Sequence, residues 1–274
     1  MDEVARYNTV RWQALADADA LFTRPALALD SASAREMVDP QGLLGDIAGK
    51  DVLCLAGGGG QQSVAFALLG AHVTVVDLSS AQLARDREAA THYGTAVEAI
   101  QADMRDLSQP PVQAFDIVYQ PYALNFVPEA RIVIREVARV LRPGGRYYLH
   151  CANPFFSGIG TRDWNGEGYT LRHPYVAGAE MTYNDETWVY DRGKVGETRI
   201  PGPREYRHTL GALVNGLIEQ GFILLHLSEF KDLHPDESAD PGTWSHLTAI
   251  APLWLAFWSV YRPDVLGGYT GSDD

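Results

Sequence analysis

The sequence predicts an α/β protein whose core is a seven-stranded, mostly parallel sheet with helices on both faces. Three observations support this fold class. From Lys50 onward, short apolar runs alternate with amphipathic stretches, as is typical of parallel sheets. The last two apolar runs have no long helical pattern between them, which favours an antiparallel pair at the sheet edge. Four consecutive glycines after the first run indicate a sharp turn from a strand into a helix.

The expected elements follow the chain in order. Apolar runs predict five parallel strands, at 51–56, 72–77, 96–103, 115–120 and 146–152. Helical patterns separate them, and the one that begins at Ala130 is expected to end at Pro143 and the glycine pair after it. A further helix is expected over 205–221, and the antiparallel strands over 222–230 and 252–261.

Four regions of the chain differ in composition. Residues 46–152 and 205–262 carry the alternating pattern and form the expected core. Residues 153–204 are rich in Gly, Pro, Tyr and Trp with little periodicity, which indicates an insertion that covers the substrate side of the sheet. Residues 1–45 are expected to be helical, either as a lid over the site or as ordinary helices packed on the sheet, and 263–274 as a loose tail.

The acidic composition limits the classes of partner. The formal net charge is −13, whereas proteins that bind nucleic acid usually present a basic face to the phosphates. No run reaches the roughly 18 apolar residues of a membrane span, and the first residues lack the pattern of a secretory signal. Cys54 and Cys151 lie in apolar runs and are expected to be buried free thiols in a reducing compartment. These features favour a cytoplasmic protein that acts on a small molecule, without nucleic acid or membrane as a partner.

The glycine turn and Asp77 together predict a site for an adenosine-containing cofactor. Glycines let a ligand approach the backbone closely, and the helix that follows offers unpaired N–H groups. Asp77 ends the second expected strand, where a carboxylate can accept hydrogen bonds from both hydroxyls of a ribose. The alternative is a surface acid that caps the next helix. These two features do not separate NAD binding from S-adenosylmethionine binding.

Four segments form an ordered set of motifs: VLCLAGGGG (52–60), VTVVDLSSAQLARDRE (73–88), AIQADMRDL (99–107) and FDIVYQPYALNFVPEARIVIREVARVLRPGGRYYL (115–149). Together they resemble the motifs of the class I S-adenosylmethionine-dependent methyltransferases. The resemblance covers roughly 46–152 and 205–262. It implies a Rossmann-like fold with an antiparallel last strand, methyl transfer as the activity and S-adenosylmethionine as the cofactor. An NAD-dependent oxidoreductase, the alternative, leaves the third segment, the LRPGG turn and the closing strand pair unexplained.

The resemblance also implies roles for individual positions. The backbone of the glycine turn lines the methionine part of the cofactor, Asp77 holds the ribose and Leu78 packs on the adenine. Asp103 and the Met104 N–H meet the edge of the adenine, and Gln120 meets the methionine ammonium. The turn residues concerned are Ala56, Gly57, Gly58 and Gly59.

Two positions depart from the family pattern. Cys54 stands where the family usually has an acid, and Ala56 where it usually has a glycine. Because a thiol cannot supply a carboxylate, another group is expected to anchor the amino end of the cofactor. Gln62 and Tyr7 are the candidates for this role.

Methyl transfer from a sulfonium requires mainly the alignment of donor and acceptor. A general base is needed only where the acceptor must lose a proton. Tyr122 and Asn125 follow the fourth strand and are candidates, as is His173 in the insertion; His150 in the fifth strand is either a base or a core histidine. No spacing of His or Cys typical of a metal site is present, so no metal is expected.

The insertion holds the densest group of aromatic and acidic residues. Aromatic faces with interleaved carboxylates suit a cationic or aromatic acceptor, and the candidate contacts are Trp164, Tyr175, Tyr183 and Trp188. The alternative is that these aromatics form a small core of their own. The charged run 85–88 is interpreted as a solvated helix face. The sequence alone does not identify the acceptor atom or the oligomeric state. It also leaves open that the protein binds the cofactor without catalysing a reaction.

Overall fold

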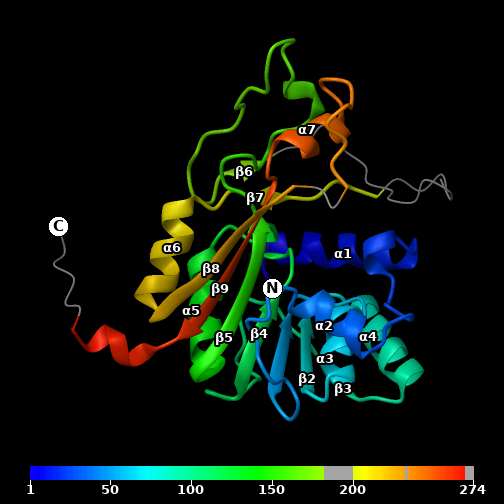
Figure 1. The fold of residues 1–274 in the computed structure, drawn as a ribbon, viewed down its shortest axis with the longest axis vertical. Coiled ribbons are helices and arrows are strands. Elements are labelled where there is room, and N and C mark those ends of the chain that lie inside the picture. Colours follow the sequence, from blue (N-terminus) through cyan, green and yellow to red (C-terminus); the bar gives the residue numbers. More distant parts are fainter. Residues whose placement is uncertain (182–199, 232–233, 269–274) are drawn as a thin grey trace.

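The computed structural model describes residues 1–181, 200–231 and 234–268. Its centre is a seven-stranded sheet in the order β3-β2-β1-β4-β5-β9-β8 (Figure 1). The strands are β1 (Asp51–Leu55), β2 (His72–Asp77), β3 (Val97–Gln101), β4 (Phe115–Gln120), β5 (Leu141–Ala152), β8 (Phe222–Phe230) and β9 (Trp254–Tyr261). β1 to β5 are parallel, and β9 pairs antiparallel with both β5 and β8. The predicted fold class is therefore confirmed.

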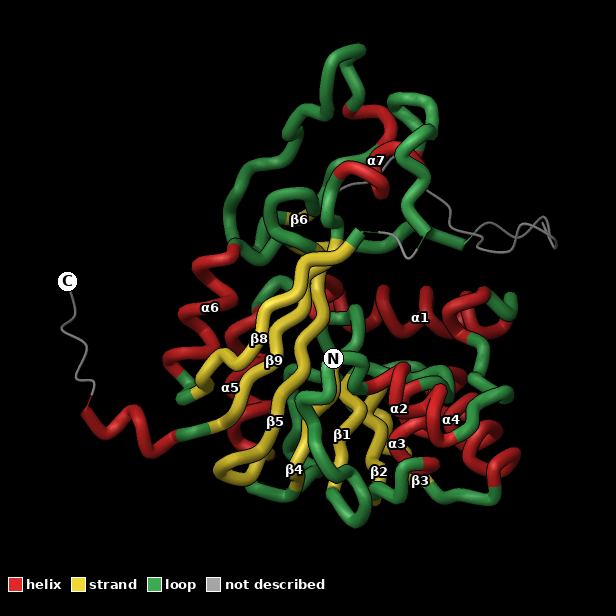
Figure 2. The backbone as a smooth tube through the Cα atoms, viewed as in Figure 1, coloured by secondary structure: helices red, strands yellow, loops and turns green. Residues whose placement is uncertain are grey.

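The central strands β1, β2 and β4 are largely apolar and buried because helices cover both faces of the sheet there (Figure 2). Val52 and Cys54 of β1 pack on the side of α2 (Ser31–Val38), α3 (Gln62–Leu68) and α4 (Ser80–Tyr93). Leu53 and Leu55 pack on the opposite side, with α5 (Ala130–Val140) and α6 (Leu210–Glu219). Cys54 and Cys151 are buried free thiols, as expected. None of the helices within the described ranges has the length and apolar character needed to cross a bilayer.

The boundary between α5 and β5 differs from the prediction. The helix was expected to continue to Pro143, but it ends at Val140, and Leu141 already pairs with Phe115 of β4. The register shifts directly after this pair, which accommodates the turn that contains the glycine pair. A Cβ at Gly145 would lie 3.0 Å from the carbonyl oxygen of Asp116, so the two strands approach here only because this residue has no side chain.

A cap lies over the carboxyl ends of the strands (Figure 1). One part follows β5 and includes β6 (Glu180–Met181) and β7 (Glu205–Tyr206), which pair antiparallel. The other part connects β8 to β9 and contains α7 (Trp244–Ile250). Ile159 of the first part packs with Leu247 and Leu253 of the second in a small core. The cap is thus built from two connections, and the polar sequence before α7 does not predict the second.

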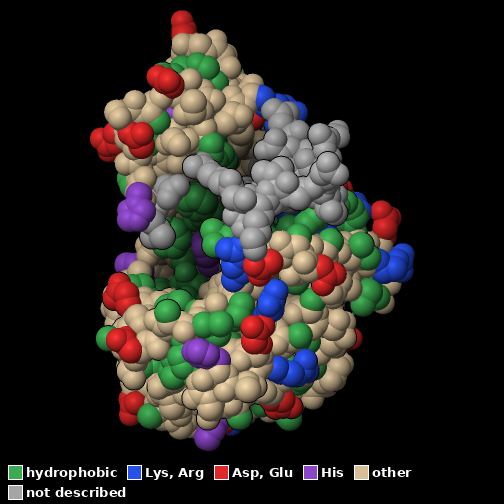
Figure 3. All heavy atoms as spheres, turned by 90° about the vertical axis from the view of Figure 1, so that its right-hand side faces the viewer, with side chains coloured by type: hydrophobic (Ala, Val, Ile, Leu, Met, Phe, Trp, Pro, Cys, Tyr) green, Lys and Arg blue, Asp and Glu red, His purple; other side chains and the backbone are tan. Residues whose placement is uncertain are grey.

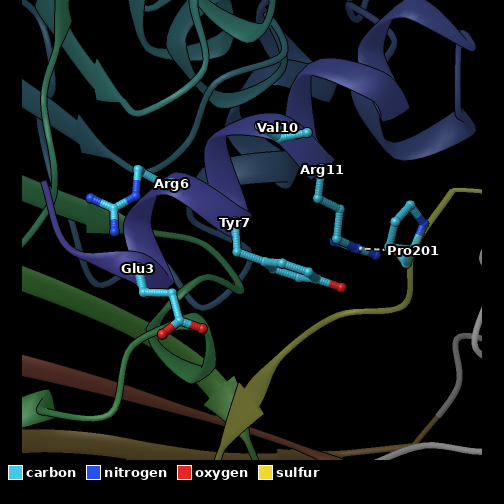
Figure 4. Close-up of a pocket in the computed structure, with 6 residues that line it drawn as sticks. All are labelled: Glu3, Arg6, Tyr7, Val10, Arg11 and Pro201. Atoms are coloured by element: carbon cyan, nitrogen blue, oxygen red, sulfur yellow. Dashed lines mark hydrogen bonds between the residues drawn. The ribbon is translucent and has the colours of Figure 1, made fainter.

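Helix α1 (Glu3–Asp17) joins the cap to the core. The side-chain amide of Asn8 donates to the Phe126 carbonyl oxygen at 2.8 Å, on the core side. On the cap side, the Arg11 Nε donates to the Pro201 carbonyl oxygen at 2.9 Å, and the Tyr7 hydroxyl to that of Gly202 at 2.7 Å. Figure 4 shows Tyr7 and Arg11 directed toward the segment of Pro201. α1 therefore closes one side of the gap between cap and sheet.

Candidate active site

A cavity of about 930 Å³ lies between the cap and the sheet. Its floor consists of the residues that end or follow parallel strands: 56–58 after β1, 77–78 at β2, 102–104 after β3 and 121–123 after β4. Ala5, Asn8 and Trp12 of α1 form one wall, and the cap forms the roof. Figure 3 shows the hollow between the two lobes with hydrophobic side chains inside it. This is where open α/β sheets bind their ligands.

Gly58 and Asp77 meet at the floor of this cavity. The Gly58 N–H donates to Asp77 Oδ2 at 3.1 Å, and the Ser79 N–H donates to Oδ1 at 2.8 Å. A Cβ at Gly58 would lie 2.6 Å from the Cβ of Gln82 and 2.9 Å from the Asp77 carboxylate, closer than real contacts allow. The glycine is therefore required by the approach of β2 and α4 to the turn.

Ala56 departs from the family pattern at a strained position. Its φ of 50° is in the left-handed region, which glycine adopts without a steric penalty and alanine does not. Ala56 nevertheless lines the cavity with its neighbour Gly57. Alanine at this position therefore keeps the turn that the family forms with glycine, at a cost in backbone conformational energy.

Asp86 holds the same turn from beneath. Its carboxylate accepts hydrogen bonds from the N–H groups of Gly59 and Gly60, at 3.2 and 3.1 Å, and from the Ser63 hydroxyl at 2.5 Å. The side chain is completely buried, so the prediction that residues 85–88 form a solvated face is wrong for Asp86. The available signal was helical spacing: Asp86 is three residues from both Leu83 and Ala89, which are also buried.

Both acids that hold the turn have raised pKa values. Burial raises the pKa of Asp77 to about 6; burial, with the charge of Asp77 adding to it, raises the pKa of Asp86 to about 7. The N–H groups of residues 58, 59 and 60 already donate to these carboxylates. Of the two acids only Asp77 lines the cavity, so a ligand meets its carboxyl group here, which suits hydroxyl groups better than a diphosphate.

Most residues expected to bind the cofactor lie together in the cavity wall. They are Ala56, Gly57, Gly58, Gln62, Asp77, Leu78, Asp103 and Met104. Gly59 does not line the cavity, and its N–H donates to the Asp86 carboxylate. Gln120 is buried within the sheet, where its side-chain carbonyl accepts a bond from the Tyr147 hydroxyl at 2.5 Å. Tyr7 lies in a separate cavity of about 330 Å³ on another face of α1.

Asp103 has a partner that the sequence does not predict. Its carboxylate accepts bonds from the Arg105 side chain, the shortest at 2.7 Å, and from the Arg105 N–H at 2.9 Å. The same guanidinium donates to Asp2 at the start of α1, at 2.7 Å. Arg105 thereby links the floor of the cavity to α1.

The four catalytic candidates occupy different environments. Tyr122 and His150 line the cavity. Asn125 is buried and bonded to backbone: its amide donates to the Tyr206 carbonyl, and its oxygen accepts from the Ala152 N–H. His173 does not line the cavity. Its ring packs against Gly158, where a Cβ on the glycine would lie 3.0 Å from the imidazole.

The aromatic residues of the insertion divide in the same way. Trp164 packs edge-on against Tyr169 and His246, and Tyr175 stacks on Phe155, so both contribute to packing within the cap. Tyr183 and Trp188 lie outside the described residues. The wall contains Phe156 of the insertion and three aromatic residues that were not singled out as substrate contacts, Phe126, Trp244 and Trp254, together with the buried acid Glu205.

Known proteins share both the sequence and the fold. Residues 53–149 match the family described as "Methyltransferase domain". The chain is 31% identical over 187 residues to "Uncharacterized methyltransferase YbaJ" from Bacillus subtilis (strain 168), a match that covers 68% of this chain and 70% of that protein. It is 37% identical over 108 residues to a "Ubiquinone biosynthesis O-methyltransferase" from Pseudomonas syringae pv. tomato, covering 39% of this chain and 47% of that relative.

Solved structures extend the likeness over most of the chain. An S-adenosylmethionine-dependent methyltransferase from Mesorhizobium loti has a TM-score of 0.59 at 24% identity, covering 86% of this chain and 100% of that one. The magnesium protoporphyrin IX methyltransferase (ChlM) from Synechocystis PCC 6803, solved with bound SAH, has a TM-score of 0.52 at 16% identity, covering 85% and 83%. At these identities the structures show the shared fold. Fold and sequence together place this chain in the class I S-adenosylmethionine-dependent methyltransferase family, with S-adenosylmethionine as its cofactor.

Proposed function

We propose that this enzyme transfers the methyl group of S-adenosylmethionine to a small, largely apolar molecule held between the cap and the sheet. The observation that carries the proposal is one continuous cavity with most of the predicted cofactor residues in its wall and a mainly apolar roof. Sites for one small ligand typically measure roughly 300–1,000 Å³. A cavity of about 930 Å³ is at the upper end of this range, which agrees with a site shared by the cofactor and a compact acceptor.

The floor residues would hold the cofactor. In this proposal Asp77 accepts bonds from the ribose hydroxyls and Leu78 packs on the adenine, while the backbone of 56–58 lies along the methionine part. Gln62, in the first turn of α3, takes the place of the acid missing at Cys54. Bound S-adenosylmethionine supplies a methyl group that is already electrophilic, so the protein contributes alignment and the exclusion of water.

The roof and the charge support a small acceptor over a nucleic acid. Phe156, Ile159 and Leu253 line the roof and bring apolar surface to the ligand. The net charge of −13 opposes the approach of a polyphosphate backbone. The name of the relative from Pseudomonas syringae, which refers to ubiquinone biosynthesis, agrees with a small acceptor.

We assign the lid role to the amino-terminal region 1–45 and the cover of the acceptor to the insertion 153–204. The hydrogen bonds of α1 to both lobes support the first assignment, because opening the cavity on that side requires α1 to move. The small core of Ile159 and Leu247 supports adding residues 231–253 to the cover. The catalytic core then consists of residues 46–152 and 205–262, except for the connection 231–253 between β8 and β9.

Calorimetry followed by labelled methyl transfer tests the function. We expect the protein to bind S-adenosylmethionine and SAH, and to label a small molecule when supplied with methyl-labelled cofactor and a fractionated metabolite extract. Asp77→Asn should weaken cofactor binding, whereas Asp106→Asn, an exposed acid outside the cavity, should not. Absence of cofactor binding at millimolar concentration, or label found only in protein or nucleic acid, would contradict the proposal.

A further inference from the structure

We propose that His150 takes the proton from a hydroxyl group of the acceptor, so that the enzyme forms O-methyl products from an apolar hydroxylated molecule. This inference rests on the proposed function, because it names the acceptor class of the same cavity. It also assigns Tyr122 as the residue that positions the imidazole.

His150 lines the same cavity as the glycine turn and the apolar roof. It projects from β5, and its ring is 5.6 Å from that of Tyr122 at an interplanar angle of 73°. Pro121, the residue before Tyr122, packs against the glycine turn: a Cβ at Gly57 would lie 3.4 Å from its ring. A ligand group beside His150 therefore shares the cavity with the cofactor floor, to which Tyr122 and Pro121 connect, and with the apolar roof.

The imidazole has an unused hydrogen-bonding capacity. Its Nε2 is buried and has no hydrogen-bond partner within the described part of the chain. Its ring neighbours are Tyr122, Tyr148 and Phe230, all in aromatic contact. Burial lowers the pKa of His150 to about 4, so the ring is neutral at neutral pH; in the tautomer with the proton on Nδ1, Nε2 offers a lone pair to a donor. Buried polar groups in native proteins are nearly always paired, so a missing partner points to a ligand.

The buried acid Glu205 holds Tyr122, whose ring lies beside His150, in its orientation. The Tyr122 hydroxyl donates to Glu205 Oε2 at 3.0 Å, and Glu205 is only 2% exposed. This bond joins the loop after β4 to β7 of the cap and holds the Tyr122 ring edge-on to the imidazole. Tyr122 thus acts on the acceptor through His150.

The remaining polar groups do not call for a charged acceptor. Arg172, in the cavity wall, pairs with the buried Asp163 at 2.9 Å. Arg162 is exposed at the rim. The rest of the roof is mainly apolar, as the residues Phe156, Ile159 and Leu253 illustrate. An uncharged molecule with one donor group matches this wall.

His150 can serve as the base in the methyl transfer, with every bond and proton accounted for. The acceptor oxygen forms a bond to the methyl carbon as the carbon–sulfur bond breaks, and the electron pair of that bond stays on sulfur. The hydroxyl proton passes to the imidazole, which later releases it to water. A hydroxyl benefits from this base because neutral oxygen is a weak nucleophile, whereas an amine attacks with its own lone pair.

A matched pair of probes tests the inference by binding alone. Protein saturated with SAH is titrated with 2-naphthol and with 2-methoxynaphthalene, which lacks the donor. We expect 2-naphthol to bind about tenfold more tightly, the effect of roughly one hydrogen bond. His150→Phe should abolish this difference, and the same change at the exposed His72, at the start of β2, should preserve it.

A second measurement concerns turnover. With methyl-labelled cofactor and a metabolite extract, we expect the label on an oxygen atom, and His150→Gln should lower kcat by about a hundredfold or more with the dissociation constant for SAH unchanged. Tyr122→Phe should lower kcat less. Label on nitrogen, sulfur or carbon, equal affinity for both probes, no binding of 2-naphthol, or discrimination that survives His150→Phe would each overturn the inference. Failure of the wild-type protein to bind SAH would instead refute the proposed function.

Discussion

The carboxylate of Asp86 lies 3.1 Å from the backbone nitrogen of Gly60, so a side chain of α4 supports the glycine turn from beneath. Asp86→Asn brings an N–H group against a backbone N–H, and we expect the dissociation constant for S-adenosylmethionine to rise about tenfold, the effect of an unpaired buried donor. Isothermal titration measures this. Glu88→Gln, an exposed change two residues along the same helix, is the control, and equal constants for both variants would contradict the role of Asp86.

Cofactor affinity is expected to fall as the pH drops below about 6. Burial raises the pKa of Asp77 to about 6, and only its ionised form can accept bonds from both ribose hydroxyls. Affinity should decrease about tenfold for each further pH unit, and Asp77→Asn should flatten the profile. Titration calorimetry across this range is the measurement, and a flat profile for the wild type would contradict the role of Asp77.

The stability of the cofactor-free protein should change with pH in the opposite sense. The folded protein holds the protons of Asp77 and Asp86 more tightly than the unfolded chain does, because burial raises both pKa values. The stability that these groups contribute at low pH is therefore lost as the pH rises through about 6 and then about 7. Denaturant unfolding of Asp86→Asn should show a weaker decline than the wild type over this range.

Gly58→Ala should disrupt the turn. Its new Cβ would lie 2.6 Å from the Cβ of Gln82, and overpacking of this kind costs about 1–3 kcal/mol. We expect a lower free energy of unfolding and weaker cofactor binding. Gly211→Ala in α6 is the matched control, since nothing lies within 4 Å of its Cβ, and it should leave both quantities unchanged or slightly raise stability. Wild-type binding by Gly58→Ala would show that the close approach is not required.

Arg105→Ala should loosen α1. It removes ion pairs of 2.7 Å to both Asp2 and Asp103, and so detaches the start of the helix from the cavity floor. We expect faster dissociation of S-adenosylmethionine in stopped-flow experiments. Arg142→Ala is the control, because Arg142 also bridges two acids, Asp51 and Asp116, at the opposite ends of the strands. Equal dissociation rates for the two variants would argue against a lid.

Both thiols should be unreactive in the folded protein. Cys54 and Cys151 are completely buried, and burial raises the pKa of Cys151 to about 12 and that of Cys54 in the same direction. A chromogenic disulfide reagent should label neither until denaturant is added, after which it should label both. Rapid labelling of the native protein would contradict the packing around β1 and β5.

The parts of the site that depend on local pattern were predictable. A strand buried on both faces must be apolar throughout, so the run before Gly57 identified β1, and the run that ends at Asp77 identified β2. Because neighbouring parallel strands end at the same edge, Gly58 and Asp77 were expected to meet, and they are hydrogen-bonded. The helix boundary at Val140 was less predictable, because pairing with β4 decided it.

The amino-acid sequence alone was thus enough to specify the sheet, the glycine turn and Asp77 beside it, because these depend on hydrophobic periodicity and on local sequence. Tertiary structure decided that Asp86 accepts a bond from the Gly60 N–H, that Tyr7 faces away from the cavity, and that Tyr122 meets Glu205 across 83 positions. The physical reason is that each of these contacts joins elements whose relative placement depends on how whole layers pack, and no local pattern encodes that placement.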